Sequence, residues 1–335
     1  MAEDITLVTG ATGFVGSAVA RILLERGHRL RLLVRQTSDR SNVSGLPVEF
    51  VVGDLADPQS MEKALEGVTY LFHVAADYRL WVPDPDVMMK ANVEGTRILM
   101  QAAMKAGVKR VVYCSSVAAL ATARDGIPAT ESSPVTEDQI VGVYKRSKYR
   151  AEQEVLRLVR EEGLPAVIVN PSTPVGPRDI KPTPTGQMIL DCATGRMPAY
   201  VETGLNIVHV DDVAEGHVLA FERGVIGEKY ILGGENLMLG ELFRMVAEIV
   251  HRKPPRIQLK QSWLYPVASV SEMLARRFGI QPRVTREMLD MSKKLMFFSS
   301  AKAERELDYR PRAARHALID AVAWFREHKR GGFGA

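Results

Sequence analysis

The chain has little cysteine: only Cys114 and Cys192 among its 335 residues. Two cysteines cannot build a disulfide framework, and neither belongs to a CxxC pair or a Cys/His cluster of the kind that holds zinc. A disulfide-stapled secreted scaffold is therefore disfavoured, and we expect no metal site. With this cysteine content, a reducing, cytoplasmic setting is the expectation.

Two further features of exported and membrane proteins are missing from the sequence. The N-terminus carries Glu3 and Asp4 where a signal peptide needs a basic run followed by an apolar core. No window of about 18 uncharged apolar residues occurs, so we expect no membrane-spanning segment. These absences argue against secretion and against an integral membrane protein.

The sequence also lacks a large excess of charge of one sign, because 44 Lys and Arg residues nearly balance 40 Asp and Glu residues, for a net charge of +4. Nucleic-acid binding normally concentrates basic residues on one face, so no nucleic-acid partner is expected. Hydrophobic residues make up 46% of the chain, which is ordinary for a soluble globular protein. The length fits one large domain or two closely joined ones, and the small basic excess leaves room for an anionic small ligand.

The first half of the chain alternates short apolar runs with amphipathic stretches. Strand-like runs fall at 5–9, 30–35, 48–52, 70–74, 110–114 and 166–170, and helical patterns at 14–27, 88–107 and 142–162. The strand-like runs are continuously apolar, which is typical of a parallel sheet covered on both faces. The sequence therefore predicts an α/β fold with a Rossmann-type doubly wound parallel sheet.

After residue 170 the pattern changes. Five prolines between 171 and 184 predict an irregular segment. Helices dominate beyond it, with short strand candidates at 206–210 and 229–232. We place a nucleotide-binding domain over 1–172 and a smaller, mainly helical substrate lobe over 173–330, with 205–232 returning to the first domain.

A glycine-rich motif, Thr-Gly-Ala-Thr-Gly-Phe-Val-Gly at 9–16, falls where the first predicted strand gives way to the first predicted helix. Gly10 permits a tight turn, Gly13 lets the backbone approach a pyrophosphate, and Gly16 allows close packing of helix on strand. The phosphates would meet free N–H groups at the positive end of the helix dipole. A glycine turn without a ligand is the alternative, but the flanking strand and helix favour dinucleotide binding. The expected contacts come from Gly10, Thr12, Gly13, Phe14, Val15 and Gly16.

The second predicted strand ends in Arg35. An NAD site commonly places an acidic residue about here to accept a hydrogen bond from the ribose 2′-hydroxyl, whereas a guanidinium can clamp a 2′-phosphate. We therefore expect NADP as the cofactor, with NAD as the alternative and a solvated surface arginine as the competing interpretation. Asp54 and Leu55, after the third strand, would place a carboxylate and a backbone N–H against adenine.

Tyr144 and Lys148 stand four residues apart on one face of the long predicted helix. A free phenol has a pKa of about 10, and a neighbouring ammonium is expected to lower it. The pair gains meaning from Ser115 and Ser116 at the end of the fifth strand, because the ligand crevice of an open parallel sheet lies outside the strand ends. Ser116, or Ser115 in its place, would hydrogen-bond a substrate oxygen there.

Together with Asn92, these motifs resemble the extended short-chain dehydrogenases/reductases of the NAD-dependent epimerase/dehydratase superfamily. The resemblance covers nearly the whole chain, including 73–76 and 208–214. It implies that Ser116, Tyr144 and Lys148 are catalytic. The tyrosine would exchange a proton with a hydroxyl or carbonyl while hydride moves to or from the nicotinamide, and the lysine would also hold the nicotinamide ribose. Further cofactor contacts are implied for Ala75, Ala76, Asn92, Ser115, Pro171 and Thr173.

Within the family, residues 170–186 are most similar to the hopanoid-associated sugar epimerases, which connects the chain with hopanoid biosynthesis. Residues 302–311 and Arg35 are similar to dihydroflavonol-4-reductase-like enzymes. Ordinary nucleotide-sugar epimerases usually carry an acidic residue where Arg35 stands. The resemblance thus implies an oxidoreductase or epimerase acting on a secondary alcohol or ketone. A carbonyl reductase releases its NADP+, whereas an epimerase retains the cofactor. A non-catalytic dinucleotide-sensing protein would have no need of Tyr144 and Lys148.

The sequence says less about which residues bind the substrate. Segments that could line a pocket are 77–81, 118–124, 178–197 and 263–278. The apolar segment 262–268 suits the core of a helical lobe, which we favour, but also a hydrophobic substrate or approach to a membrane surface. His73 and His209 follow strands and are expected to be structural. The resemblance also implies a homodimer paired through helices matching 86–107 and 142–162.

Overall fold

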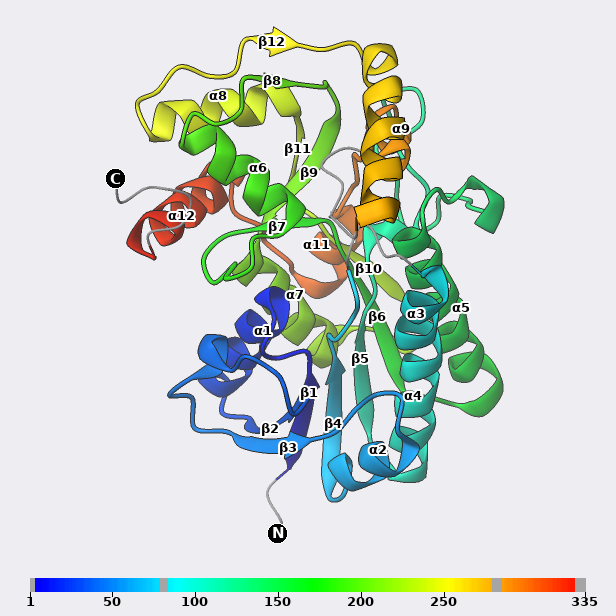
Figure 1. The fold of residues 1–335 in the computed structure, drawn as a ribbon. Helices are drawn as coiled ribbons and strands as arrows, with labels where there is room; N and C mark the ends of the chain where they lie inside the picture. The colour runs from blue at the N-terminus through cyan, green and yellow to red at the C-terminus, as the bar shows by residue number, and fades with distance from the viewer. Residues whose placement is uncertain (1–3, 79–83, 279–284, 329–335) are drawn as a thin grey trace.

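The computed structural model describes residues 4–78, 84–278 and 285–328. Its larger sheet has seven strands (Figure 1). In spatial order the strands are β10 (Lys229–Leu232), β6 (Ala166–Pro171), β5 (Arg110–Cys114), β4 (Val68–His73), β1 (Ile5–Thr9), β2 (Arg29–Val34) and β3 (Glu49–Val52). Every neighbouring pair is parallel. The predicted doubly wound parallel sheet is confirmed, with the order reversing between β1 and β4.

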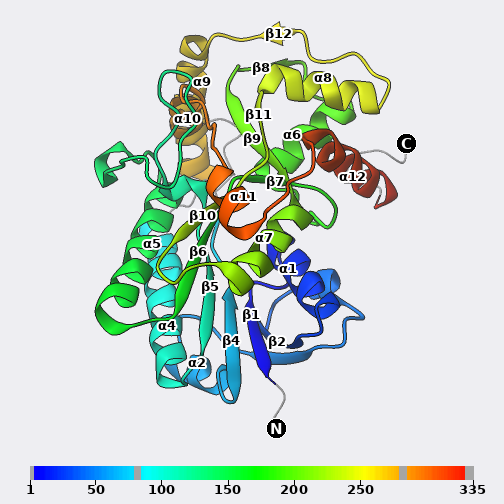
Figure 2. The same ribbon diagram turned by 180° about the vertical axis from the view of Figure 1, so that it is seen from behind.

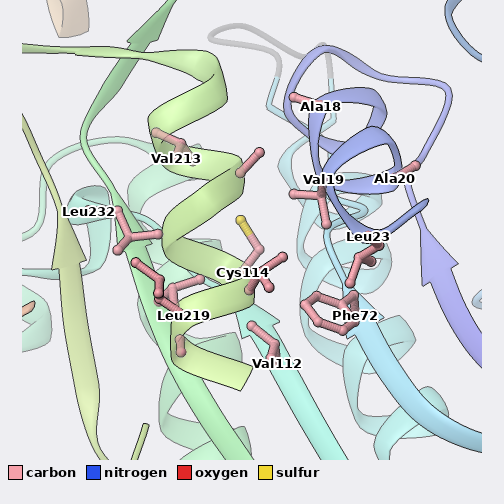
Figure 3. Packing of buried hydrophobic residues seen from close by; sticks show 14 of the residues in the cluster. Ala18, Val19, Ala20, Leu23, Phe72, Val112, Cys114, Val213, Leu219 and Leu232 are labelled. Carbon is pink, nitrogen blue, oxygen red and sulfur yellow. The ribbon is translucent and has the colours of Figure 1, made fainter. Parts of the chain in front are cut away.

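Helices cover both faces of this sheet, as its apolar strands require. On one face lie α1 (Phe14–Glu25) and α7 (Val210–Arg223), which pack against each other. Figure 3 shows this layer, where Leu23, Phe72, Val112 and Leu219 belong to one buried cluster. The opposite face is covered by α2 (Pro58–Ala64), α4 (Gly95–Lys105) and α5 (Val143–Glu162).

The helix predicted over 88–107 consists of three joined pieces. They are α3 (Pro85–Met89), a π-helical turn η2 (Lys90–Glu94) and α4. Such π turns inside α-helices often occur at functional sites, because the extra residue re-aims the side chains around it. Asn92 lies in this turn and is buried.

A smaller set of elements surrounds a second sheet of three strands. These strands are β7 (Thr173–Val175), β9 (Gly204–His209) and β11 (Glu235–Met238), in the order β11-β9-β7. Around them pack α6 (Pro184–Ala193), α8 (Leu239–Ile249) and α12 (Ala314–Glu327), with Phe243 and Phe325 in the shared core. The remaining elements are β8 (Ala199–Tyr200), β12 (Ile257–Gln258), α9 (Gln261–Phe278), α10 (Arg286–Ser292), α11 (Ala301–Leu307) and the 3-10 turns η1 (Ser41–Val43), η3 (Val117–Ala119) and η4 (Glu137–Gln139).

The prediction of an irregular segment over 171–184 is wrong in three places, the first being Pro171, which is the last residue of β6. Pro174 lies in β7, which is an edge strand where a missing N–H is tolerated. Pro184 opens α6 at its first position, where the N–H would have had no helical partner. Both β7 and α6 therefore accept a proline, because neither position needs a backbone N–H to donate a hydrogen bond.

Segment 205–232 is divided between the two sheets. β9 belongs to the small sheet, whereas α7 packs on α1 and β10 forms the edge of the large sheet (Figure 2). The domain boundary near 173 stays a prediction. In the described part of the chain, no helix combines the length and hydropathy needed to cross a bilayer.

The favoured interpretation of 262–268 as ordinary core is wrong for the outer face of α9. Ala268 is buried, but the side chains of Trp263 and Val267 are 65% and 53% exposed. Helical periodicity predicts two faces for this segment, and both of them turn out to be apolar.

The turn between β1 and α1 depends on two glycines. Gly10 has φ +70°, and a Cβ on it would lie 2.6 Å from the Ala75 backbone nitrogen. A Cβ on Gly16 would collide with the Gly10 carbonyl oxygen. The first turn of α1 therefore lies directly against the end of β1 and the segment that follows β4.

We expect Gly16→Ala to lower the free energy of unfolding by about 3 kcal/mol, because the Cβ would meet the backbone of Gly10 and Ala11, which cannot move aside as a flexible side chain could. Gly45→Ala is the control, since Gly45 has φ +76° with open space around it and should lose only about 1 kcal/mol. Urea unfolding of both variants measures the difference. Equal losses would contradict the close packing inferred at Gly16.

Candidate active site

Lys148 is held at the carboxyl end of β5 by a buried hydrogen bond. Its side chain is in the second turn of α5, and the residue is only 2% exposed. The ammonium Nζ donates to the Cys114 carbonyl oxygen over 2.8 Å and lies 5.1 Å from the centre of the Tyr113 ring. In the structure, Lys148 of α5 therefore contacts the end of β5, as the sequence predicts.

Ser116 and Tyr144 come together beside this lysine. Ser116 precedes the 3-10 turn η3, and its hydroxyl oxygen accepts a hydrogen bond of 3.1 Å from the Ala118 nitrogen. That bond leaves the Ser116 hydroxyl proton available, and the hydroxyl acts on the Tyr144 phenol as a hydrogen-bond partner that lowers its pKa. The two hydroxyls thus form one polar patch at the strand end.

The pKa of Tyr144 moves opposite to the direction expected from the sequence. Burial raises it to about 12, and the Ser116 hydrogen bond offsets only part of that rise. Lys148 is not among the groups that shift this pKa; its ammonium donates to the Cys114 carbonyl, and burial lowers its own pKa. At neutral pH the phenol therefore holds its proton and is ready to donate it.

Ser115 faces the interior, where it joins a buried network around Glu152. The Ser115 hydroxyl donates to Glu152 over 2.6 Å, and the Asn170 amide donates to the same carboxylate oxygen over 2.7 Å. Lys229 pairs with the other oxygen at 3.3 Å. Asn170 also donates to the Ser116 carbonyl oxygen over 3.0 Å. This network fixes the strand end and favours Ser116 over Ser115 as the substrate-side hydroxyl.

Asn92 is buried in the π-helical turn and clamps a loop to α5. Its carboxamide oxygen accepts from the Asp77 nitrogen at 2.7 Å, and its amide nitrogen donates to the Asp77 carbonyl oxygen at 2.8 Å and to the Ser147 hydroxyl at 2.9 Å. The loop that includes Ala75 and Ala76 is thereby held beside Gly10. Asn92 is a positioning residue for this loop, because all of its polar atoms are engaged by protein groups.

The N-terminus of α1 has the properties of a phosphate cradle. Gly13 is its N-cap, no side chain caps the turn, and no acidic residue lies in the first turn. Asn42 supports the turn, donating to the Thr12 carbonyl oxygen at 3.3 Å and to the Arg178 carbonyl oxygen at 3.2 Å. Phe14 and Val15 pack partly into the core and anchor the helix.

The remaining predicted cofactor residues follow the same edge of the sheet. Arg35 is exposed just beyond β2, and its backbone nitrogen is bonded to Ser38. Asp54 is exposed and accepts a hydrogen bond from the Ala56 nitrogen, while Leu55 lies against Gly95 of α4. No described acidic side chain forms an ion pair with Arg35.

Pro171 ends β6, Thr173 begins β7, and an unsatisfied group lies between them. The Ser172 hydroxyl is buried and has no hydrogen-bond partner among the described residues. A buried hydroxyl without a partner is costly, so this atom indicates a ligand group or water at the site. The glycine cradle, the uncapped helix end and this orphaned hydroxyl together fit a nicotinamide dinucleotide.

A cavity of about 590 Å³ is lined in part by Ala118 and Lys145, which follow Ser116 and Tyr144 closely in the chain. Its lining is mostly apolar and comes from the loops after β5, from Lys145 and from α10 and the segment that follows it. The predicted lining segment 118–124 contributes Ala118 and 120–124. The described parts of 77–81, 178–197 and 263–278 do not contribute, and 79–81 lie outside the described residues.

The two strand-end histidines have protein partners on both ring nitrogens. His73 lies between the Thr9 and Thr96 hydroxyls, and burial lowers its pKa to about 3. The Nδ1 of His209 accepts from the Asp211 nitrogen, and its Nε2 bonds Asp320. These contacts agree with the expected structural roles.

Sequence reasoning missed several residues that shape the site. Glu152 had a readable signal, because Tyr144, Lys148 and Glu152 follow each other at intervals of four along α5. Asn42 and Asn170 had none, since their partners are distant in the chain. Lys145 was overlooked beside the more prominent Tyr144.

Comparison with known proteins agrees with this geometry. Residues 6–233 match the NAD dependent epimerase/dehydratase family. A putative dihydroflavonol 4-reductase from Synechocystis sp. is 44% identical, over 97% of this chain and 95% of that protein. Sterol demethylase protein B from Methylococcus capsulatus is 38% identical, over 96% and 98%. The crystal structure of gox2253 has a TM-score of 0.89 at 75% identity, covering 98% of this chain and 99% of that one.

The family match, the two relatives and the Rossmann-type sheet agree on one class of enzyme. The chain belongs to the NAD-dependent epimerase/dehydratase family, the extended short-chain dehydrogenases/reductases, and is an NAD(P)-dependent oxidoreductase or epimerase.

Proposed function

We propose that this protein is a cytoplasmic, NADP-dependent reductase of ketones with an apolar body, working through Ser116, Tyr144 and Lys148. The observation that carries the proposal is the geometry at the end of β5, where Ser116 partners the Tyr144 phenol and the nearby Ala118 and Lys145 line a cavity with a mainly apolar wall. The same residues would catalyse the reverse oxidation of a secondary alcohol.

Each residue has a distinct task in this scheme. Tyr144 donates its proton to the carbonyl oxygen, since its pKa of about 12 keeps it protonated at neutral pH. Ser116 donates a hydrogen bond to the same oxygen and stabilises the charge that develops on it. Lys148 ties α5 to the end of β5 through the Cys114 carbonyl and would hold the nicotinamide ribose.

The cofactor supplies the hydride when it is bound. Gly10, Thr12, Gly13 and the first turn of α1 would hold its pyrophosphate, and Arg35 its 2′-phosphate. Asp54 and Leu55 would meet the adenine, and Ala75, Ala76, Pro171 and Thr173 would line the path to the nicotinamide.

A net reductase is favoured over an epimerase by two observations. One of the two relatives reported above is named as a reductase, and the other as a component of a sterol demethylase. Arg35, in place of an acidic residue, suits a cofactor that exchanges as NADPH and NADP+ in each cycle. An epimerase that retains its cofactor remains the second candidate on the family match alone.

Replacing Tyr144 by Phe removes the proposed proton donor without removing the ring. We expect kcat for ketone reduction to fall at least about 100-fold, because the carbonyl oxygen loses its acid catalyst. Affinity for NADPH, followed by its fluorescence, should stay within a few-fold. Tyr149→Phe, on the same helix, is the control. A Tyr144→Phe enzyme with near-normal kcat would rule out the proton route.

Arg35→Ala tests the choice of cofactor. Losing a charged contact to the 2′-phosphate should weaken NADPH binding by about tenfold or more. NADH binding should be unchanged, because NADH has no phosphate there. Fluorescence titration of the two nucleotides measures both effects. If both affinities stay as in the wild type, Arg35 is only a solvated surface residue.

Lys145 supplies a pH-dependent charge at the cavity wall. Burial, followed by repulsion from Lys294, lowers the pKa of Lys145 to about 8. Its charge is therefore present below about pH 8 and lost above it. We expect KM for 4-acetylbenzoate, but not for its methyl ester, to rise as the pH passes through this range.

Lys145→Met should remove that pH dependence and bring the KM values of the acid and its ester closer, while Arg124 and Lys294 keep positive charge in the same lining. Lys293→Met is the matched control, because Lys293 is exposed and pairs with Asp290 outside the cavity lining. A pH dependence that persists in Lys145→Met would assign the effect to another group.

A further inference from the structure

Helix α9 presents an apolar face that no described element covers. Its inner face, with Ala268 and Ala275, is buried. The outer face carries five exposed apolar side chains, which we call the outer stripe. They are Trp263 (65% exposed), Val267 (53%), Val270 (51%), Met273 (61%) and Leu274 (44%).

The outer stripe has the spacing of one continuous helical face. Trp263, Val267, Val270 and Leu274 follow each other at intervals of four, three and four residues, and Met273 lies between the last two. Contiguous exposed apolar side chains on one helix face mark an interaction surface. The stripe therefore calls for a partner.

The segment that leads into α9 is strongly basic, and we call residues 252–260 the basic arm. Arg252, Lys253, Arg256 and Lys260 are all exposed, and no acidic residue occurs between Glu248 and Glu272 in the sequence. None of these four side chains forms an ion pair within the part of the chain that the structure describes. Positive charge and exposed apolar surface thus adjoin each other.

The two features share one end of the molecule. β12, within the basic arm, and α9 lie at the end opposite the N-terminus in both views (Figures 1 and 2). Ile257 of β12 is itself 57% exposed and adds an apolar side chain to the arm. A flat partner could therefore contact the arm and the stripe at once.

We propose that the outer stripe and the basic arm dock this protein on bilayers that contain anionic lipid. The apolar side chains would enter the boundary between headgroups and acyl chains, with Trp263 at the interface. The four basic residues would be attracted to anionic headgroups. Charge argues against a second copy as the occupant, because pairing two such surfaces would bring two basic arms together.

Co-sedimentation of the full-length protein with vesicles tests this proposal. Vesicles with about 30 mol % phosphatidylglycerol in phosphatidylcholine should bind the wild type at least about tenfold more tightly than phosphatidylcholine alone, and high salt should reduce the difference. Val267→Asp/Val270→Asp should lose about tenfold or more in affinity. Arg256→Gln/Lys260→Gln should lose the preference for phosphatidylglycerol.

Ile319→Asp is the matched control, since Ile319 is an exposed apolar residue on α12, outside the surface. Its vesicle binding should equal that of the wild type. Light scattering measures whether the stripe instead pairs two copies of the protein. The proposal would be overturned if the wild type were a dimer that bound no vesicles and if Val267→Asp/Val270→Asp dissociated that dimer. Equal binding by all three variants and the wild type, or no binding to any vesicle, would also overturn it. NADPH affinity, measured in parallel, reports on the proposed reaction independently.

Discussion

The hydrogen bond from the Lys148 ammonium to the Cys114 carbonyl ties α5 to the end of β5, and the site is organised around it. A buried ammonium is costly unless a polar group satisfies it. The Cys114 carbonyl at the end of the strand meets this need, so the contact helps to set how α5 docks on β5. Tyr144 is thereby placed one turn earlier along α5, beside Ser116, and Glu152 one turn later, beside Ser115.

The same arrangement explains why the strand end is rigid. Glu152 is fully buried and is satisfied by Ser115, Asn170 and Lys229, which belong to three different elements. A buried carboxylate with several charge-assisted bonds holds its partners firmly, because losing any one of them leaves charge uncompensated. The site is thus assembled from polar groups that have few alternative partners.

Much of this was predictable from the sequence, for physical reasons that differ between elements. Buried strands such as β5 and β6 are continuous apolar runs, and glycines mark the turn into α1, so local pattern suffices there. The π turn at Asn92 and the strand β7 were missed, because tertiary contacts decide both. The pKa of Tyr144 was expected to fall, since spacing shows that Lys148 is near along the helix but not that burial dominates the pKa of the phenol. The exposure of Trp263 could not be foreseen. The sequence pattern predicts burial for any apolar helix face and does not show which face meets the rest of the protein.

The account depends on Tyr144 carrying its proton at neutral pH. The most direct measurement is an NMR titration of the protein with 13Cζ-labelled tyrosine, with Tyr144→Phe used to assign the resonance. The account predicts that this resonance shows no phenolate up to about pH 10, the value of a free phenol, because burial places its pKa at about 12. Phenolate formation between about pH 6 and 8 would contradict it, since Tyr144 would then be a base in the resting protein.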